Sequence, residues 1–373
     1  MEVTFRFAVR SDLGTVRTNN EDSALASPHL LVLADGMGGH AAGEVASTVA
    51  TRVFARLADD MPDGAATEVS DVAARITQAG RATRSALQQM SDADPMLESM
   101  GTTLLTVVSH SGQITVGHIG DSRVYALRGA SLYQVTTDHT HVQRLVDTGQ
   151  LTPEKARTHP YRAMLLRSLD DQPGGPDLDV IALEIEPGDR LLLCSDGLSD
   201  YLAPEEIGQV LAHPDRDEAA ELLIDAALRV GTRDNVTVVV ADVVEETDAD
   251  ERATELAGAV VDGLDLSETA SAALRETLPA LAPLIVREAA QPVTEPDEPE
   301  TDPEPNPPEP EPETEASEPE DESPAVEQEI EPKPRKPRTE PTAEVGPQRD
   351  SLFPAALASA LIVLVGLAIW LIL

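Results

Sequence analysis

The stretch that decides the fold is His29-Leu30-Leu31-Val32-Leu33-Ala34-Asp35-Gly36-Met37-Gly38-Gly39-His40, an apolar run that ends in an acid inside a glycine-rich turn. An apolar run of about five residues between turn formers predicts a buried strand. The glycines allow positive φ and let the backbone approach a ligand closely, so Asp35 and a neighbouring carbonyl oxygen can face one cation together. Taken alone, the same residues also describe an ordinary Asp-Gly turn between a strand and a helix.

Three further acids occur in the same context, beside a turn at the end of an apolar or β-branched run. Four carboxylates that converge from strand ends repel one another strongly unless cations lie between them. No His or Cys cluster accompanies them, which disfavours zinc, whereas oxygen ligands favour Mg²⁺ or Mn²⁺. Two such ions about 4 Å apart can activate a water and hold a phosphoryl oxygen. The further acids are Asp121 after residues 116–119, Asp196 after residues 191–194, and Asp234 before residues 236–240.

A phosphate bound at such ions also needs a cationic side chain that holds it. Arg17 lies in the turn-rich segment 11–22, which also supplies Glu21 and Asp22, and it is the best-placed candidate. When Arg17 is taken alone, a surface arginine without this role explains the sequence equally well.

Up to Glu245 the chain alternates groups of β-like runs with pairs of amphipathic helices, which predicts an α+β domain of helices layered on sheets. Four β-like runs follow one another through connections of two or three residues, so we expect them to be antiparallel neighbours. The polar, irregular segment 138–167 indicates an insertion or flap. The four runs are 102–109, 113–119, 123–127 and 131–136, and the expected helices are 43–57, 69–90, 204–211 and 216–230.

The charge is strongly acidic, with a formal value of -40 over 373 residues. Residues 1–245 hold 19 Lys and Arg against 37 Asp and Glu (19 - 37 = -18), and the remainder holds 8 against 30 (8 - 30 = -22). This balance argues against nucleic acid as a partner, because phosphate neutralisation needs Lys and Arg. The single cysteine, Cys194, excludes an internal disulfide, and its apolar surroundings predict a buried, unreactive thiol.

Beyond Glu245 the composition changes. Residues 246–291 can form short helices, whereas residues 292–350 are rich in Pro and Glu, carry a basic cluster at 333–338, and predict a disordered linker. Residues 352–373 are uncharged and mostly apolar, long enough to cross a bilayer core of roughly 30 Å. We therefore expect a single C-terminal transmembrane helix over 351–373. The basic residues upstream of it place the rest of the chain in the cytoplasm, where the absence of a signal peptide also puts it.

Six motifs follow one another in the chain: Ser11-Asp12-x-Gly14-x-x-Arg17-x-Asn19-Asn20-Glu21-Asp22, Ala34-Asp35-Gly36-Met37-Gly38-Gly39-His40, Gly101-Thr102-Thr103, Gly120-Asp121-Ser122-Arg123, Ser195-Asp196-Gly197-Leu198 and Asp234-Asn235-Val236-Thr237. Together they resemble the ordered motifs of the bacterial metal-dependent, type 2C protein serine/threonine phosphatases. The match spans residues 1 to about 245, which makes it far more specific than any single motif. It implies a four-layer α-β-β-α sandwich of two antiparallel sheets, with a binuclear metal centre at one end.

The resemblance also implies a role for each candidate residue. Asp35, Asp196 and Asp234 would be metal ligands, and the carbonyl oxygen of Gly36 would be another. The implied cofactors are two Mn²⁺ or Mg²⁺ ions, and Asp121 would join Asp196 at a third metal site of bacterial members.

Three residues of the first motif complete the implied site. Glu21 and Asp22 would hold waters of the metal centre, and Arg17 would bind the substrate phosphate. The family members of animal type carry a histidine directly after Asp-Gly, proposed as the general acid, whereas this chain has Met37. His40 lies three residues further on, and we expect it to cap or pack at a helix start, so a water at the metal centre can serve as the acid instead.

The function that this resemblance implies, together with the expected membrane anchor, is hydrolysis of phosphoserine and phosphothreonine in proteins, which would reverse Ser/Thr kinase signalling at the membrane. The expected partners are phosphorylated proteins, including membrane Ser/Thr kinases and their substrates. One alternative is a pseudophosphatase that binds phosphoproteins without hydrolysing them, although the acids and Arg17 are intact. The other is a metal-dependent hydrolase of small phosphoesters, for which the sequence offers no recognition groups.

Overall fold

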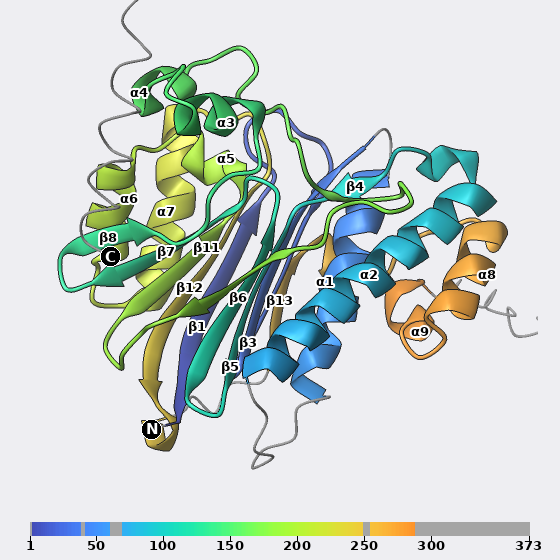
Figure 1. The fold of residues 1–373 in the computed structure, drawn as a ribbon, viewed down its shortest axis with the longest axis horizontal. Coiled ribbons are helices and arrows are strands. Elements are labelled where there is room, and N and C mark those ends of the chain that lie inside the picture. Colours follow the sequence, from blue (N-terminus) through green and yellow to red (C-terminus); the bar gives the residue numbers. More distant parts are fainter. Residues whose placement is uncertain (1, 39–41, 60–68, 249–253, 288–373) are drawn as a thin grey trace, which may run out of the picture. The chain divides into compact units, whose positions relative to one another are not determined.

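The computed structural model describes residues 2–38, 42–59, 69–248 and 254–287, which form two antiparallel sheets with helices on their outer faces (Figure 1). Every pairing between strands of these sheets is antiparallel. The first sheet has the order β1 (Val3–Asp12), β12 (Val236–Glu245), β11 (Arg190–Cys194), β7 (Arg123–Arg128) and β8 (Ser131–Gln134). The second has the order β10 (Asp179–Leu183), β6 (Gln113–Ile119), β5 (Leu104–His110), β3 (Leu30–Met37), β2 (Asp22–Ser27) and β13 (Glu255–Gly258), with β4 (Gly101–Thr102) and β9 (Leu169–Asp170) attached through β3.

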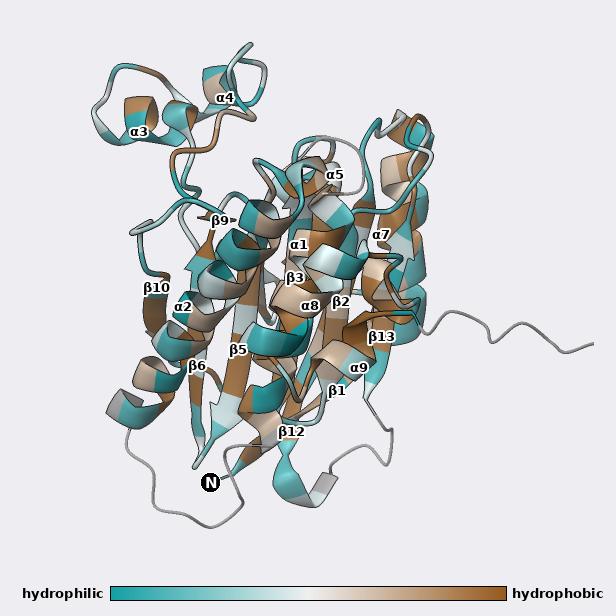
Figure 2. Ribbon diagram, turned by 90° about the vertical axis from the view of Figure 1, so that its right-hand side faces the viewer, coloured by the Kyte–Doolittle hydropathy of each residue, from teal (hydrophilic) through white to brown (hydrophobic). Residues whose placement is uncertain are grey.

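Helices cover both outer faces, as the α+β prediction requires. Figure 2 shows α1, α2, α8 and α9 in front of the strands of the second sheet, with hydrophobic residues on those strands. The helices of that layer are α1 (Ala42–Asp59), α2 (Val69–Ala93), α8 (Glu268–Thr277) and α9 (Ala282–Ile285), and those of the opposite layer are α5 (Asp196–Ser199), α6 (Pro204–Leu211) and α7 (Arg216–Val230). Short 3-10 helices lie at Pro95–Leu97, Glu246–Asp248 and Ala259–Val261.

Strand β3 is buried on both faces, which explains its unbroken apolar sequence. Side chains alternate across a strand, so Leu31 and Leu33 enter the core between the sheets, whereas Leu30 and Val32 enter the core shared with helices α1 and α2. Cys194, at the end of β11, is a fully buried free thiol, as its apolar context predicts. Burial raises its pKa to about 12.

One expectation about the strands was wrong, and one strand was not predicted. The runs 113–119 and 123–127 are not neighbours, because β6 lies in the second sheet and β7 in the first. Gly120, with φ of +109°, turns the chain from one sheet to the other instead of folding it back as a hairpin. The sequence also gave no sign of β2, whose small side chains lack strand propensity. They fit a close approach of α1, where the Oγ atoms of Ser23 and Ser47 lie 3.0 Å apart.

The segment 138–167, called the flap here, rises from one end of the sheets and carries two short helices (Figure 1). These are α3 (His141–Asp147) and α4 (Pro153–Ala156), each capped by a threonine side chain. The base of the flap is closed by the bridge between Thr140 and Leu165.

The packed structure continues past Glu245. Strand β13 pairs with β2, and α8 and α9 add their apolar side chains to the core beneath α1 and α2. None of the helices in the described ranges is long and apolar enough to cross a membrane. The predicted linker over 292–350 and the predicted transmembrane helix over 351–373 lie outside the described residues.

Candidate active site

The candidate residues come from loops and strand ends of both sheets and gather at the upper end of the sheets in Figure 1. Asp35 lies near the end of β3, directly opposite Asp22 of β2. Asp196 follows the end of β11, and Asp234 precedes the start of β12. Asp121 lies in the crossing between β6 and β7. Antiparallel neighbours bring one strand's end to the other's start, which is why acids distant in sequence meet here.

Arg17 is held between two acids. Its Nη1 lies 3.2 Å from Oε2 of Glu21, and its Nη2 lies 2.8 Å from Oδ1 of Asp234. The Arg17 side chain is 41% exposed, whereas that of Glu21 is 8% exposed. The guanidinium therefore remains open to solvent and can reach an anion without losing its acidic partners.

Asn235 fixes the loop that carries Arg17 and Glu21. Its Oδ1 accepts the backbone N–H of Glu21 at 2.8 Å, and its Nδ2 donates to the carbonyl oxygens of Asn19 at 3.0 Å and Leu13 at 3.2 Å. Sequence reasoning placed Asn235 in a motif without finding this role. Its position directly after a candidate ligand was the available signal.

Asp22 is buried, and one oxygen of its carboxylate accepts a hydrogen bond from a neighbouring side chain. Its Oδ2 accepts the Ser195 hydroxyl at 2.9 Å, and the Ser195 Oγ accepts the backbone N–H of Thr237 at 3.0 Å. Burial raises the pKa of Asp22 to about 6. The carboxylate is thus kept in place by Ser195, directly after β11, and by Thr237 of β12, which holds the Ser195 hydroxyl; both strands belong to the other sheet.

Asp35 and Gly36 lie where backbone and side chains are most crowded. The backbone N–H of Asp35 donates to Thr103 Oγ1 at 3.0 Å, and the N–H of Gly36 donates to the Glu21 carbonyl at 3.1 Å. A Cβ on Gly36 would lie 2.1 Å from the carbonyl oxygen of Gly43. Only glycine fits, which is the close backbone approach that the sequence predicts.

The acids perturb one another. Burial raises the pKa of Asp35, and burial likewise raises the pKa of Asp196. Neighbouring negative charges raise both further, because each ionised acid disfavours the next. For Asp35 these neighbours are Asp22, Asp196, Asp121 and Asp234, and for Asp196 they are Asp121, Asp200, Asp234 and Asp22. The structure therefore brings all the predicted acids into one electrostatic unit.

Asp121 and Asp196 also line a cavity of about 360 Å³ between the flap and helices α5 and α6. Burial raises the pKa of Asp121 to about 7. Asp138 and Asp200, which sequence reasoning missed, line the same cavity. Asp138 forms a two-pronged pair with Arg123, whose Nη2 lies 2.6 Å from its Oδ2, and Asp200 pairs with Arg162 of the flap at 2.8 Å. Asp200 follows Asp196 by one helical turn, a spacing that could have identified it.

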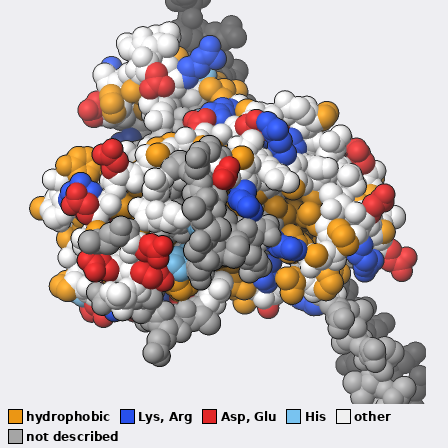
Figure 3. Space-filling model, turned by 60° about the horizontal axis from the view of Figure 1, so that its bottom comes forward, with side chains coloured by type: hydrophobic (Ala, Val, Ile, Leu, Met, Phe, Trp, Pro, Cys, Tyr) orange, Lys and Arg blue, Asp and Glu red, His pale blue; other side chains and the backbone are white. Residues whose placement is uncertain are grey.

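Another cavity, of about 310 Å³, lies between α1, α2 and residues 277–281 and contains none of the candidate residues. The bottom face of the domain, drawn in Figure 3, gathers hydrophobic side chains beside basic ones. Of these two cavities, the acidic one under the flap is the one lined by candidate residues.

The donor set fits a hard divalent cation. Oδ1 of Asp196 is buried and has no hydrogen-bond partner among the described residues. The excess of buried carboxylates would be offset by positive charge, and the ligand atoms are all oxygen, as Mg²⁺ and Mn²⁺ prefer. In the part of the chain that the structure describes, no three His, Cys, Asp or Glu side chains already surround one ion position. A site completed by a backbone carbonyl and waters needs fewer such side chains.

Known proteins resemble this chain in sequence and in fold. A family model described as protein phosphatase 2C matches residues 17–238. The chain belongs to the protein phosphatase 2C family. It is 48% identical over 272 residues to the serine/threonine protein phosphatase PstP of Mycobacterium tuberculosis, a match that covers 72% of this chain and 51% of PstP. This protein phosphatase 2C chain thus spans about half the length of that relative.

A second relative is covered almost completely. The serine/threonine phosphatase stp of Listeria monocytogenes is 32% identical over 240 residues, which is 62% of this chain and 94% of the relative. A crystal structure of the PstP catalytic domain in complex with two manganese ions superposes with a TM-score of 0.60 and 47% identity, covering 65% of this chain and 100% of that one. The resemblance to bacterial type 2C phosphatases and the fold of two antiparallel sheets flanked by helices are confirmed, and the Mn²⁺ or Mg²⁺ prediction agrees with the ions in PstP.

Proposed function

We propose that the protein is a metal-dependent protein serine/threonine phosphatase that hydrolyses phosphoserine and phosphothreonine in proteins. The observation that carries the proposal is the position of Arg17, whose exposed guanidinium lies between Glu21 and Asp234 at the edge of a cluster of buried acids. A phosphate placed there meets a planar donor that can bind two of its oxygens at once.

Each predicted site residue then has a task. Asp35, the Gly36 carbonyl, Asp196 and Asp234 would hold two Mn²⁺ or Mg²⁺ ions. The ions would supply an activated water as the nucleophile and positive charge for the phosphoryl oxygens. Glu21, Asp22 and Asp121 would surround them, Asp121 together with Asp196 at a third position.

The protein side chains position the substrate and keep the acids ordered. Arg17 would bind the phosphate, while Asn235 keeps the loop of Glu21 in place and Ser195 orients Asp22. Met37 lies at the end of β3 opposite Gly101 and carries no proton to donate. The leaving oxygen must therefore receive its proton from a group other than side chain 37, and His40 lies outside the described residues.

The domain proposal divides the chain by composition. Residues 1–245 would be the phosphatase domain, 246–291 an added helical segment, 292–350 an acidic linker, and 351–373 a transmembrane anchor with the catalytic part in the cytoplasm. Tethering to a membrane raises the effective concentration of the enzyme toward membrane Ser/Thr kinases and their phosphorylated substrates.

The test is turnover by the full-length chain of a phosphothreonine peptide and a small phosphoester, each with Mn²⁺ and with chelator. We expect Mn²⁺-dependent hydrolysis and a higher kcat/KM for the peptide. Tight peptide binding without turnover would favour a pseudophosphatase, and a preference for the small ester would favour a phosphoester hydrolase. Deleting residues 350–373 should release the enzyme from membranes without changing kcat on peptides, and a deletion variant that still sediments with membranes would contradict the anchor.

A further inference from the structure

His139 connects the candidate site to the base of the flap. Its Nδ1 accepts the backbone N–H of Gly120 at 3.1 Å, and its own backbone N–H donates to the Gly120 carbonyl at 2.8 Å. Its carbonyl oxygen accepts the N–H of Leu166, on the returning arm of the flap, at 2.7 Å. One residue therefore holds both arms of the flap and the residue that precedes Asp121.

The hydrogen bonds determine where the ring proton lies. Because Nδ1 accepts from Gly120, the neutral imidazole carries its proton on Nε2, and the acceptor for that proton is Oδ2 of Asp179 at 3.0 Å. Nη1 of Arg167 also lies 2.8 Å from Nε2. A guanidinium can only donate, so with the proton on Nε2 this contact is a close approach and not a hydrogen bond. The other oxygen of Asp179 pairs with Nη2 of Arg167 at 2.8 Å. Burial lowers the pKa of His139, which agrees with a neutral ring.

A second histidine supports this ring from behind. His118 stacks on His139 with ring centroids 4.6 Å apart and planes inclined by 25°. His118 is 1% exposed, and neither of its ring nitrogens has a hydrogen-bond partner among the described residues. Burial lowers the pKa of His118 to about 3, so it is a neutral, flat surface against which the His139 ring rests.

Gly120 sets the direction in which Asp121 leaves β6. Its φ is +109°, and a Cβ at this position would lie 2.6 Å from Thr103, so the turn has a single backbone path. Both of its hydrogen bonds to His139 act on this path. Loss of the Nδ1 acceptor would leave a largely buried N–H unpaired at the turn.

We propose that His139 is a positioning residue that sets the Gly120–Asp121 turn and ties it to the base of the flap. Movement of the flap base is then coupled to the position of Asp121, which lines the cavity under the flap. The consequence for turnover rests on the proposed function, whereas the coupling itself can be measured without it.

Two variants separate the two ring nitrogens. In His139→Asn the amide oxygen can take the place of Nδ1, whereas in His139→Gln the amide reaches toward the position of Nε2 and leaves the Gly120 N–H without its acceptor. Hydrogen exchange of the full-length protein reads the result. In His139→Gln, peptides covering 118–122 and 164–168 should exchange roughly tenfold faster, and in His139→Asn they should stay near wild type. Peptides from β12 should not change in either variant.

Activity gives a second measurement. The kcat/KM for a phosphothreonine peptide should fall roughly tenfold in His139→Gln and much less in His139→Asn. Wild-type exchange at both segments in both variants would overturn the proposal, and so would faster exchange spread evenly over the domain. If the wild-type chain hydrolyses no phosphopeptide, the proposed function fails, and the exchange contrast still decides this inference.

A second pair keeps the test decisive if the His139 variants do not fold. Asp179 is 48% exposed, so its substitution disturbs the core little. Asp179→Asn retains an acceptor for the Nε2 proton, and Asp179→Leu removes it. The same contrast in exchange at 118–122 and 164–168 is expected, with Asp179→Leu faster. Equal exchange in the two variants would overturn the proposal.

Discussion

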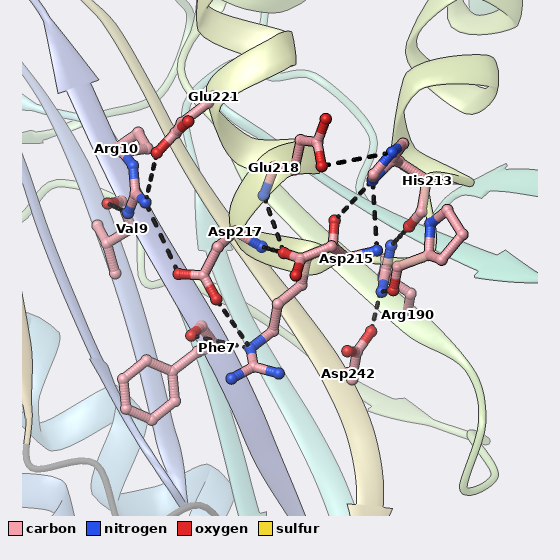
Figure 4. A network of polar contacts seen from close by, with 12 residues as sticks. Phe7, Val9, Arg10, Arg190, His213, Asp215, Asp217, Glu218, Glu221 and Asp242 are labelled. Carbon is pink, nitrogen blue, oxygen red and sulfur yellow. Dashed lines mark hydrogen bonds and ion pairs between the residues drawn. The ribbon is translucent and has the colours of Figure 1, made fainter.

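Strands β11 and β12 run antiparallel, and the acidic side chains near their two ends differ: at one end they are paired with positive groups, and at the other end they gather beside one another. At one end Arg190 lies opposite Asp242, and toward the other end Cys194 lies opposite Val238, beyond which Asp196 and Asp234 enter the candidate site. The end at Arg190, drawn in Figure 4, pairs its acids with cations or helix N–H groups, whereas the site end collects acids. The same two strands thus support the Arg190 end, where the charges are balanced within the chain, and the site end, where bound cations would offset the excess negative charge.

The paired end is satisfied within the chain. Arg190 Nε lies 2.5 Å from Oδ1 of Asp242, and its Nη1 donates to the carbonyl oxygens of Leu211 at 2.9 Å and of His213. Asp215 caps helix α7 by accepting the N–H groups of residues 217 and 218. The helix N–H of Glu218 lowers the pKa of Asp215, whereas burial and neighbouring acids raise the pKa of Asp35 and Asp196.

The comparison teaches that the buried acids of the site do not serve the stability of the fold. A buried charge destabilises unless it is paired, and Oδ1 of Asp196 lacks a partner among the described residues. Buried acids that destabilise the fold in this way are typical of functional sites, where a bound ligand offsets the unfavourable burial of charge.

Of the variants considered, Asp196→Asn should cause the largest loss of activity, because it removes an acid from the site end of the strands. The substitution removes a carboxylate expected to contact more than one ion, so we expect kcat/KM for a phosphothreonine peptide to fall roughly 10³-fold or more with the fold retained. The matched control is Asp242→Asn on the neighbouring strand, which should keep its activity. A folded Asp196→Asn protein with near-normal turnover would show that this acid is not a ligand.

Arg17→Ala tests the cation at the site end. Loss of a charge-assisted hydrogen bond to phosphate should lower kcat/KM by a factor that corresponds to about 1.5–3 kcal/mol of transition-state stabilisation. The change should appear chiefly in KM where the contact is already made in the ground state. Steady-state kinetics with the same peptide measure the change. The control is Arg10→Ala, because Arg10 pairs with Glu221 of helix α7 at 3.0 Å and is not among the predicted site residues. Equal kinetics for both variants would mean that another residue binds the phosphate.

Arg190→Ala tests the paired end. It leaves Asp242 and the carbonyl oxygens of Leu211 and His213 without their donor, so we expect the free energy of unfolding to fall by about 2 kcal/mol. Denaturant unfolding measures this change, and kcat on a peptide at 25 °C should stay near wild type. Unchanged stability would show that water replaces these hydrogen bonds without loss.

The smallest effect concerns pH in the presence of chelator. The pKa of Asp22 is raised to about 6 and that of Asp121 to about 7, mainly by burial. Between about pH 4 and pH 7 these two acids, together with Asp35 and Asp196, bind more protons in the folded protein than in the unfolded chain, so their contribution to stability falls as the pH rises through this window. Burial lowers the pKa of His118 and His139, so these two groups act in the opposite direction, and we expect the four acids to outweigh them. The melting temperature with chelator should be lower at pH 7.5 than at pH 5.5, and Mn²⁺ should raise it at pH 7.5. Asp121→Asn should weaken the pH dependence, and a melting temperature that increases with pH would contradict the prediction.

The local sequence predicted most of the elements and the chemistry of the site. Strand β3 shows as an unbroken apolar run because it is buried on both faces, and α6 and α7 have the expected bounds of Pro204–Leu211 and Arg216–Val230. The acids were recognisable because each lies beside a turn at the end of an apolar run. These signals are local, so periodicity and turn chemistry carry them.

Other features depended on contacts between distant segments. Strand β2 is stabilised by its neighbours and by α1, not by its own small side chains. The crossing at Gly120 between the sheets depends on a positive φ and on His139, nineteen positions later. Asp200 and Asp138 joined the cavity only through the packing of the flap.

By itself, the sequence determined the α+β class, the family and the oxygen-rich donor set, because each of these depends on residue types and on their order along the chain. Only the tertiary structure decided which sheet each strand joins, that Arg17 lies between Glu21 and Asp234, and that burial and neighbouring acids raise the pKa of Asp35 and Asp196. The physical reason is that charge interactions and packing depend on distance in space, and residues such as 17 and 234 become neighbours only when the sheets assemble.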